Sequence, residues 1–460
     1  MRRSVLISGL ALCLGFAALM VYLGYFYLLR APRLQAHPLN PRTELTAATV
    51  HRGGILDRNG EILAQSVGNK RLYPLGSAAS HVTGYLSRYH GSTGVEQAAN
   101  GWLAGLMGTE NALNRLRRLV GKPGRGYDVI LTVDARLQQR ASELLGGRRG
   151  AIVVLNPTTG EVLALVSSPA FDPEEVDSRW SELERRTDAP LLNRALNGLY
   201  PPGSVAKVLT AALALETDPA LGSKRYPCPG YLVIEGRRLE CPAAHGEVDL
   251  AQALVRSCNV TYARLALELG VERFRSVNYR WGFNRQLPFD LPVSKSRLPT
   301  ERLSPNALAE IGIGQGRLVM TPFHIALVTA AIANQGMTVP PRLLSGVRLP
   351  GGGVTPVSSP APPWPMFSSL AAAYLSRAMT AVVEEGTGRQ ARIPGLEVAG
   401  KTGTAENPHG PPHAWFTGFA PAGAPRVVAT VLVENGGSGG TVAAPLAREL
   451  LTFALSLTER

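Results

Sequence analysis

The sequence predicts an α/β protein of the α+β type, with three parts: a transmembrane helix, a small mixed domain, and a larger domain built on a central antiparallel sheet flanked by helices. One observation is the unbroken apolar run Val5–Leu29. The others are strand patterns at two distant places and a predominantly helical stretch between them, Val205–Glu385. The strand patterns cover Ala151–Leu155, Glu161–Ser167, Leu396–Ala405, Ala414–Ala420 and Val427–Glu434.

The apolar run contains no charge and, at ~1.5 Å per residue, is long enough to cross a ~30 Å hydrocarbon core. A signal peptide has a shorter apolar region and a cleavage site with small residues, whereas this run leads into Leu29-Arg30-Ala31-Pro32. We therefore predict a cytoplasmic stub at residues 1–3 and an uncleaved anchor at 4–29. The remaining chain is expected on the outer side of the cytoplasmic membrane, because long domains translocate largely regardless of charge.

The segment 30–126 is predicted to hold a linker, Pro38–Thr49, and a small pedestal domain. Two apolar arms around Asn59-Gly60 predict a β-hairpin, and Gly94-Val95-Glu96-Gln97 leads into a helix. A strand beginning at Tyr127 and an amphipathic helix ending at Leu145 open the larger domain, which we place at 127–460.

The chain of 460 residues has a net charge of +13, but its basic residues do not indicate a nucleic-acid-binding protein. The arginines are scattered, and the sequence has no zinc-finger spacing and no box of stacking aromatics. Only six of the 47 basic residues are lysines, among them Lys207 and Lys401. This rarity matters because a lysine amine can be deprotonated in a protein, whereas an arginine cannot.

Four cysteines leave three alternatives open. Cys13 lies in the apolar run, whereas Cys228 and Cys241 flank a predicted hairpin that turns at Glu235-Gly236. A disulfide between them is permitted outside the cytoplasm and would be worth ~3 kcal/mol. Two free thiols are equally compatible with the sequence. A zinc site with His245 is the third alternative, but no fourth ligand is evident at a standard spacing.

Ser204 and Lys207 form the first candidate catalytic pair. Tyr200-Pro201-Pro202-Gly203 precedes an apolar run typical of a buried helix, so Ser204 is expected at the N-terminus of that helix. Lys207 is three residues further and shares a face with Ser204. A serine hydroxyl becomes a nucleophile when a neighbouring base takes its proton, and a buried lysine with a lowered pKa can be that base. The alternative is a capping serine beside a surface lysine.

A second candidate site is Lys401-Thr402-Gly403-Thr404, in a predicted strand. Lys401 and the two threonine hydroxyls are suited to bind a carboxylate through charge-assisted hydrogen bonds. Gly403 would let a substrate backbone lie against the strand edge. The alternative is an ordinary strand lysine beside a bulge glycine.

Ser257-Cys258-Asn259 is a third candidate, but Ser-x-Asn is not specific. Ser276-Val277-Asn278 and Ser304-Pro305-Asn306 share the pattern. The residues alone do not choose among the three.

The order Ser-x-x-Lys, Ser-x-Asn, Lys-Thr-Gly resembles the signature of penicillin-binding proteins and serine β-lactamases. Further segments resemble class B penicillin-binding proteins, the monofunctional transpeptidases, nearly from end to end. They are Arg52–Gly60, Arg71-Leu72-Tyr73-Pro74, His81–Tyr85, Gly94-Val95-Glu96, Tyr200–Gly203, His245-Gly246, Gly312–Gly316 and Trp415–Pro421. The short pedestal and Asn40-Pro41-Arg42 are most similar to the penicillin-binding protein A group. Cys258 departs from the β-lactamase pattern, which favours Asp there.

The resemblance implies a role for each matching residue. Ser204 is the acylated nucleophile, Lys207 deprotonates it, Ser257 relays a proton to the leaving amine, and Asn259 holds Lys207 and the substrate amide. Lys401, Thr402 and Thr404 bind the carboxylate of the stem peptide, with Gly403 between them. The backbone N–H groups of Ser204 and Thr404 form the oxyanion hole. No metal or cofactor is expected.

The resemblance further implies a D,D-transpeptidase that cross-links peptidoglycan stem peptides ending in D-Ala-D-Ala, is a target of β-lactams, and serves elongation or division. It also implies a SEDS-family glycosyltransferase as partner. One alternative is a hydrolase, either a D,D-carboxypeptidase or a β-lactamase; the anchor and pedestal argue against a secreted β-lactamase. The other is a non-enzymatic penicillin sensor or a scaffold that activates a polymerase. A sensor needs a signalling domain inside the cell, which three residues do not supply.

Overall fold

The computed structural model describes residues 2–26, 30, 50–108, 113, 114, 116, 117, 120, 122–299, 301–349, 352–357, 361–408 and 410–458. The predicted linker Pro38–Thr49 and the last residues of the predicted anchor, 27–29, lie outside them. The first helix, α1 (Arg2–Tyr25), contains the apolar stretch Leu6–Tyr25, whose mean hydropathy is 2.3 and of which no part is buried. Its length and composition suit a membrane span, as the sequence predicts.

The larger domain is centred on a five-stranded antiparallel sheet, which confirms the predicted central sheet built from both ends of the domain. The strand order is β17-β18-β19-β7-β8, so β17 forms one edge. The strands are β7 (Gly150–Leu155), β8 (Val162–Ser168), β17 (Ala399–Asn407), β18 (Gly410–Ala420) and β19 (Val427–Val433). The prediction placed β17 two to three residues too early.

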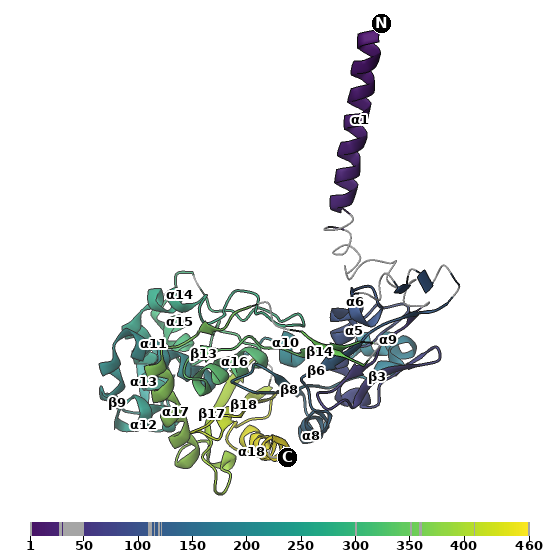
Figure 1. Cartoon of the computed structure of the whole chain (residues 1–460). Coiled ribbons are helices and arrows are strands. Elements are labelled where there is room, and N and C mark those ends of the chain that lie inside the picture. Colours follow the sequence, from purple (N-terminus) through teal and green to yellow (C-terminus); the bar gives the residue numbers. More distant parts are fainter. Residues whose placement is uncertain are drawn as a thin grey trace.

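Both faces of this sheet are covered by helices (Figure 1). On one face, α8 (Ala135–Leu145) and α18 (Ala443–Thr458) pack against Ile152 and Val154 of β7. On the other, α10 (Arg194–Asn197) and α16 (Pro322–Ala333) pack against Val153 and its neighbours. The strands are therefore apolar on both sides, as expected for a sheet without a solvent-facing surface.

The remaining helices form a second layer around α11 (Lys207–Thr217), as the predicted helical stretch implies. They are α12 (Leu250–Val255), α13 (Asn259–Leu269), α14 (Val271–Val277), α15 (Pro305–Gly312) and α17 (Ser369–Glu384), with the short turns η4 (Gly203–Ala206) and η5 (Pro219–Gly222). Outside this layer, η6 (Arg389–Ala391) packs against α18, and α9 (Val176–Arg185), which follows η3 (Pro173–Glu175), packs against Tyr85. Short strand pairs interrupt this region, which the sequence did not predict apart from one hairpin. They are β9 (Tyr226–Cys228) with β12 (Gly246–Val248), β10 (Tyr231–Ile234) with β11 (Arg237–Glu240), and β13 (Met337–Thr338) with β16 (Trp364–Pro365).

The predicted hairpin is confirmed as β10 and β11. Glu235 and Gly236 at its turn have φ of 47° and 79°. Two positive φ values in a two-residue turn match the twist of antiparallel strands. Cys228 and Cys241, which flank the hairpin, do not form a disulfide.

The pedestal contains a six-stranded sheet in the order β15-β14-β6-β2-β3-β4. Its strands are β2 (Ile55–Leu56), β3 (Ile62–Val67), β4 (Lys70–Leu72), β6 (Asp128–Leu131), β14 (Leu344–Arg348) and β15 (Val354–Pro356). β2 and β3 confirm the predicted Asn59-Gly60 hairpin. Strands from beyond residue 340 complete the sheet, so it runs across the predicted boundary at 126, which stays a prediction. Around it lie β1 (Val50–His51), β5 (Gly124–Arg125), η2 (Gly76–Ala78), α4 (Ser80–Thr83), α5 (Gly94–Ala98) and α6 (Asn100–Leu103).

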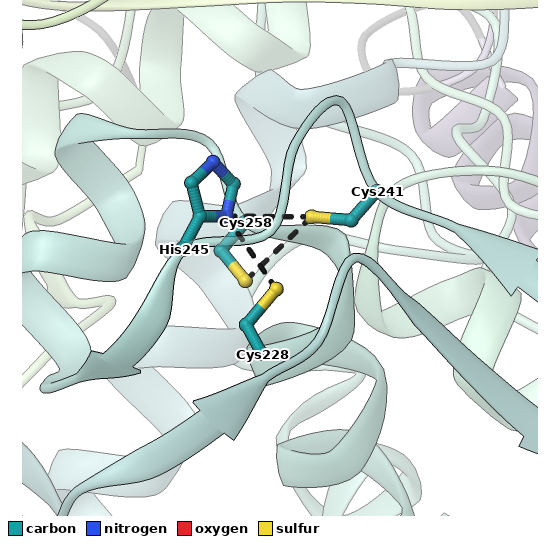
Figure 2. A group of neighbouring side chains, drawn as sticks. All are labelled: Cys228, Cys241, His245 and Cys258. Carbon is teal, nitrogen blue, oxygen red and sulfur yellow. Dashed lines mark hydrogen bonds between the residues drawn. The ribbon is translucent and has the colours of Figure 1, made fainter.

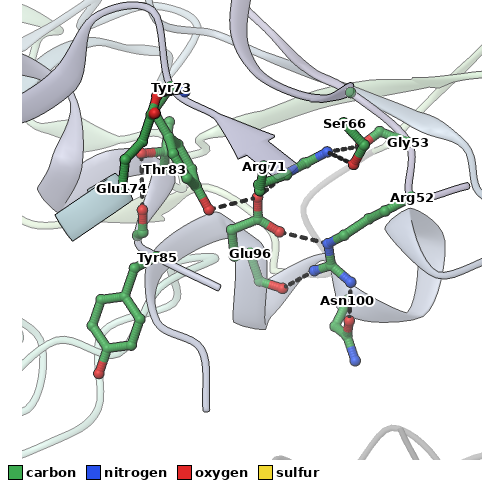
Figure 3. A network of polar contacts seen from close by, with 12 residues as sticks. Arg52, Gly53, Ser66, Arg71, Tyr73, Thr83, Tyr85, Glu96, Asn100 and Glu174 are labelled. Carbon is green, nitrogen blue, oxygen red and sulfur yellow. Dashed lines mark hydrogen bonds and ion pairs between the residues drawn. The ribbon is translucent and has the colours of Figure 1, made fainter. Parts of the chain in front are cut away.

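A buried ion network holds the pedestal together (Figure 3). Glu96 of α5 is fully buried and accepts 2.7 Å hydrogen bonds from Nε of both Arg52 and Arg71. Arg52 also donates to Asn100 Oδ1, and the hydroxyl of Tyr73 lies 3.3 Å from Glu96 Oε1. One carboxylate thus joins the segment before the hairpin, strand β4 and helix α5.

Candidate active site

Ser204 lies in the 3₁₀ turn η4, three residues before Lys207, where helix α11 begins. The sequence predicted the N-terminus of the helix, and a 3₁₀ turn is common there. Gly203 has φ of 57°, and its N–H donates to Gly314 O at 2.8 Å. A Cβ at Gly203 would lie 2.8 Å from Thr404 O, so this glycine allows η4 to approach strand β17 closely.

The segment before Ser204 is fixed from several sides. Trp415 Nε1 donates to Pro201 O at 3.1 Å, and the backbone of Tyr200 pairs with Met320. The Tyr200 hydroxyl donates to Glu434 Oε1, which also accepts from the buried Arg194, both at 2.7 Å. These contacts orient the turn that carries Ser204, which is half-buried.

Lys207 is completely buried, which rules out the surface lysine considered as an alternative. Its Nζ donates to Ser257 O at 2.6 Å and Asn259 Oδ1 at 2.7 Å, and lies 3.3 Å from Ser257 Oγ. Burial lowers the pKa of Lys207 to about 8, although the sulfurs of Cys258 and Cys241 act in the opposite direction. A pKa this close to the working pH leaves part of the lysine population neutral, which is what a general base requires.

Ser257 occupies the turn between α12 and α13 with φ of 55°, a left-handed conformation that few non-glycine residues adopt. In this turn both its carbonyl and its hydroxyl face Lys207. Asn259 begins α13, and its Nδ2 donates to Glu240 O at 2.9 Å. The amide is thereby oriented with its oxygen toward Lys207.

The structure chooses among the three Ser-x-Asn segments. The hydroxyl of Ser276 donates to Arg273 O within its own helix, and Ser304 caps α15. Among the described residues, the side-chain amine of Lys207 is hydrogen-bonded to Ser257 and Asn259 and to neither of the other two Ser-x-Asn segments. Contact with Lys207 thus distinguishes Ser257-Cys258-Asn259 from the other two Ser-x-Asn segments.

Lys401 of β17 is also fully buried, and its Nζ donates to Ser257 Oγ at 3.0 Å and to Thr402 O at 3.2 Å. Burial, and then the charge of Lys207, lower the pKa of Lys401 well below its ordinary value. The Ser257 hydroxyl therefore lies between two amines. This arrangement suits a hydroxyl that passes a proton.

The other residues of the Lys401-Thr402-Gly403-Thr404 segment lie in the same edge strand, β17. Thr404 is exposed, whereas the Thr402 hydroxyl is 2.6 Å from that of Thr387. A Cβ at Gly403 would lie 2.9 Å from Trp415 Cβ, 3.0 Å from Val205 Cγ1 and 3.1 Å from Pro202 O. The structure thus gives Gly403 a packing reason, close contact with the turn that carries Ser204, where the sequence suggested space for a substrate.

Sequence reasoning missed Thr387 and Gly439. Thr387 is an exposed residue in the turn after α17, and its hydroxyl extends the polar surface of Thr402. Gly439 belongs to the glycine-rich loop after β19, and a Cβ there would lie 2.3 Å from Gly403 O. The glycine-rich segment Gly436–Gly440 could have pointed to Gly439. No sequence signal pointed to Thr387, a single threonine between two glycines.

Comparison with known proteins gives two family matches. Residues 150–452 match the model of the penicillin binding protein transpeptidase domain, and residues 52–129 match that of the penicillin binding protein A dimerisation domain. The chain is 34% identical to the peptidoglycan D,D-transpeptidase PbpA of Mycolicibacterium smegmatis over 92% of this chain and 93% of that protein. It is 32% identical to MrdA of Acinetobacter baumannii, also named a peptidoglycan D,D-transpeptidase, over 84% and 66%.

Comparison with solved structures points to the same family. The chain resembles penicillin-binding protein A from M. tuberculosis as a ceftriaxone acyl-enzyme complex, with a TM-score of 0.82, 33% identity, and coverage of 89% of this chain and 100% of that one. Its imipenem acyl-enzyme complex gives a TM-score of 0.83 at the same identity and coverage. In both, a β-lactam is bound covalently as an acyl-enzyme.

Proposed function

Because the chain belongs to the family of penicillin-binding protein transpeptidases, we propose that it is a serine-type D,D-transpeptidase that cross-links peptidoglycan in cell-wall synthesis. The observation that carries the proposal is the row of groups Lys207 Nζ, Ser257 Oγ and Lys401 Nζ beside the turn of Ser204. It contains a base, a proton relay and a cation along one edge of the sheet. The stem peptide ending in D-Ala-D-Ala is the substrate that the family implies.

Acylation begins when Ser204 Oγ attacks the carbonyl carbon of the penultimate D-Ala and Lys207 Nζ takes its proton. The backbone N–H groups of Ser204 and Thr404 stabilise the oxyanion, a contribution of about 2.7–4 kcal/mol per donor. The peptide bond then breaks, and Ser257 Oγ gives a proton to the leaving amine of D-Ala. Lys207 returns its proton to Ser257, so the acyl-enzyme forms without net proton gain.

Deacylation reverses these roles. The amine of an acceptor stem attacks the ester carbon, its proton passes through Ser257 and Lys207, and Ser204 Oγ leaves with a proton. Lys401, Thr402 and Thr404 bind the terminal carboxylate of the donor during acylation. A β-lactam acylates the same Ser204, and its carboxylate takes the same place.

Three further aspects belong to this proposal. Helix α1 anchors the chain in the cytoplasmic membrane as a single-pass protein, with the catalytic domain outside. The protein works in elongation or division, beside a SEDS-family glycosyltransferase that provides the glycan strands. A scaffold role for the anchor and pedestal is compatible with catalysis.

Labelling with a fluorescent penicillin tests the nucleophile. Wild type should be labelled and Ser204→Ala should not; equal labelling would refute the assignment of Ser204. Ser276→Ala, in the Ser-x-Asn segment that lies away from Lys207, is the matched control and should be labelled like wild type.

Incubation with the polymerase and lipid-linked precursor, followed by muropeptide analysis, tests the reaction. Cross-linked dimers support the transpeptidase, whereas trimmed monomers alone indicate a D,D-carboxypeptidase.

A further inference from the structure

Four potential metal ligands lie close together (Figure 2), and one of them is next to Ser257 in the chain. Cys228 ends strand β9, Cys241 follows β11, His245 precedes β12, and Cys258 caps helix α13. Their ligand atoms, three sulfurs and one imidazole nitrogen, all lie within 4.8 Å of one another. The sequence suggested the first three and lacked a fourth; the fold supplies Cys258 from the middle of the Ser-x-Asn motif.

Three of the six distances between the ligand atoms match those of a tetrahedral zinc site. Zn–S bonds of about 2.3 Å and Zn–N bonds of about 2.05 Å place two sulfurs about 3.8 Å apart and a sulfur about 3.6 Å from the nitrogen. Cys241 Sγ lies 3.7 Å from Cys258 Sγ, and Cys228 Sγ and Cys241 Sγ each lie 3.5 Å from His245 Nδ1. A disulfide has an S–S distance of about 2.04 Å, so the sulfurs are spaced for a shared ion rather than a covalent bond.

Hydrogen-bond donors point at two of the sulfurs. The N–H of Asn259 lies 3.2 Å from Cys241 Sγ, and the N–H and hydroxyl of Thr261 lie 3.4 and 3.2 Å from Cys258 Sγ. Hydrogen-bond donors to the ligand atoms are typical of the outer shell of metal sites. Cys228 and Cys258 are almost fully buried, whereas Cys241 is partly exposed.

The backbone that carries the ligands is held independently of any ion. β9 and β12 pair with Cys228 opposite Gly246, and the N–H of His245 donates to Cys228 O at 3.0 Å. The N–H of Cys241 donates to Gly230 O at 2.9 Å. Preformed ligand positions reduce the cost of ordering on binding.

We propose that Cys228, Cys241, His245 and Cys258 bind one Zn²⁺ ion in a closed, structural site that positions the Ser257 turn. Four protein ligands leave no position for water, so the ion does not take part in the chemistry. Cys258 lies between Ser257 and Asn259, both of which contact Lys207. The ion therefore links the β9–β12 region to the Ser257 turn, whose residues contact Lys207. The metal site stands on its own geometry, whereas its positioning effect rests on the proposed function.

The first test measures metal. The full-length protein, purified in detergent without metal-affinity steps, should contain about one zinc per chain by elemental analysis. Cys228→Ser, which changes no residue hydrogen-bonded to the Lys207 side chain, should contain less than a fifth of that. Cys13→Ser is the matched control, because Cys13 is the cysteine outside the cluster, and it should keep the full content. Ser204→Ala should also keep its zinc while it loses penicillin labelling, which separates this proposal from that of the nucleophile.

The second test measures positioning. Removal of zinc by a chelator, or Cys228→Ser, should slow acylation by at least about 10-fold, and added Zn²⁺ should restore the rate in the chelated wild type only. Circular dichroism and the unfolding midpoint of each sample show whether the fold persists. Cobalt substitution should give the visible spectrum of a tetrahedral Co²⁺ thiolate site. Zinc content no higher in wild type than in Cys228→Ser, or a Cys241–Cys258 disulfide found by mass spectrometry, would overturn the metal site; acylation unchanged by zinc removal would overturn the positioning role.

Discussion

Lys401 Nζ donates a 3.0 Å hydrogen bond to Ser257 Oγ, which joins the edge strand of the sheet to a turn between two helices 144 residues earlier in the chain. The same hydroxyl lies 3.3 Å from Lys207 Nζ. When one of these two lysines is protonated and the other is neutral, the Ser257 hydroxyl has a proton donor on one side and a base on the other. This contact brings the three sequence motifs into one site.

Replacing Lys207 by Arg should nearly abolish acylation. Arginine keeps the positive charge but does not deprotonate, so it cannot take the proton of Ser204. The expected loss in the acylation rate constant is roughly 10²–10⁴-fold, the usual contribution of a general base. Lys224→Arg is the control, because Lys224 is half-exposed in a surface pair with Glu268. If Lys207→Arg is acylated within threefold of wild type, Lys207 is not the base.

The acylation rate should rise with pH and level off above about 8. The pKa of Lys207 is lowered from its ordinary value to about 8, so the lysine is mainly protonated at lower pH and mainly neutral at higher pH. Because the neutral amine is the base, the rate should fall roughly tenfold for each pH unit below that value. Stopped-flow acylation by a fluorescent penicillin between about pH 6 and about pH 9.5 measures the profile. A rate independent of pH would contradict the assignment.

Gly403→Ala should slow acylation and lower stability by about 1–3 kcal/mol, the usual cost of overpacking. The new methyl group would lie within 3.1 Å of Trp415, Val205 and the Pro202 carbonyl, and would push the Ser204 turn away from β17. Gly423→Ala is the control, because no atom lies within 4 Å of its added Cβ. Denaturant unfolding and penicillin labelling measure both effects. Equal behaviour of the two variants would refute the packing role.

Thr387→Val should weaken the binding of the substrate carboxylate without changing the chemical step. The Thr387 hydroxyl hydrogen-bonds that of Thr402, and valine removes this partner while it keeps the shape. Loss of one hydrogen bond corresponds to about 0.5–1.5 kcal/mol, or roughly a 2- to 13-fold weaker initial complex. Separate determination of the dissociation constant and the maximal acylation rate distinguishes the two effects. A lower maximal rate with unchanged binding would show that Thr387 acts elsewhere.

Glu96→Gln should destabilise the pedestal strongly. Burial alone would raise the pKa of Glu96, but Arg52 and Arg71 lower it overall, so the carboxylate is charged and paired on both sides. Removing one partner of a buried ion pair costs about 3–5 kcal/mol. The midpoint of denaturant unfolding measures the loss, and Glu182→Gln in an exposed pair with Arg179 should leave it unchanged. Equal midpoints for the two variants would show that the network contributes little.

Local sequence signals predicted the secondary structure well where they act over a few residues. The hairpins at Asn59-Gly60 and Glu235-Gly236 follow from turn residues that favour positive φ. Strand β17 was placed too early, because an apolar pattern does not mark where hydrogen bonding to β18 begins. The partners of β6 were also not predictable, since β14 joins it from more than 200 residues away.

The sequence by itself determined the central sheet, the apolar helix α1 and the order of the three motifs, because periodicity, turn chemistry and motif spacing are properties of neighbouring residues. Only the tertiary structure decided that Ser257 rather than Ser276 or Ser304 contacts Lys207, and that Cys258 joins Cys228, Cys241 and His245. Both depend on contacts between distant segments, and so does the lowered pKa of Lys207, since burial is produced by packing and not by the residues on either side.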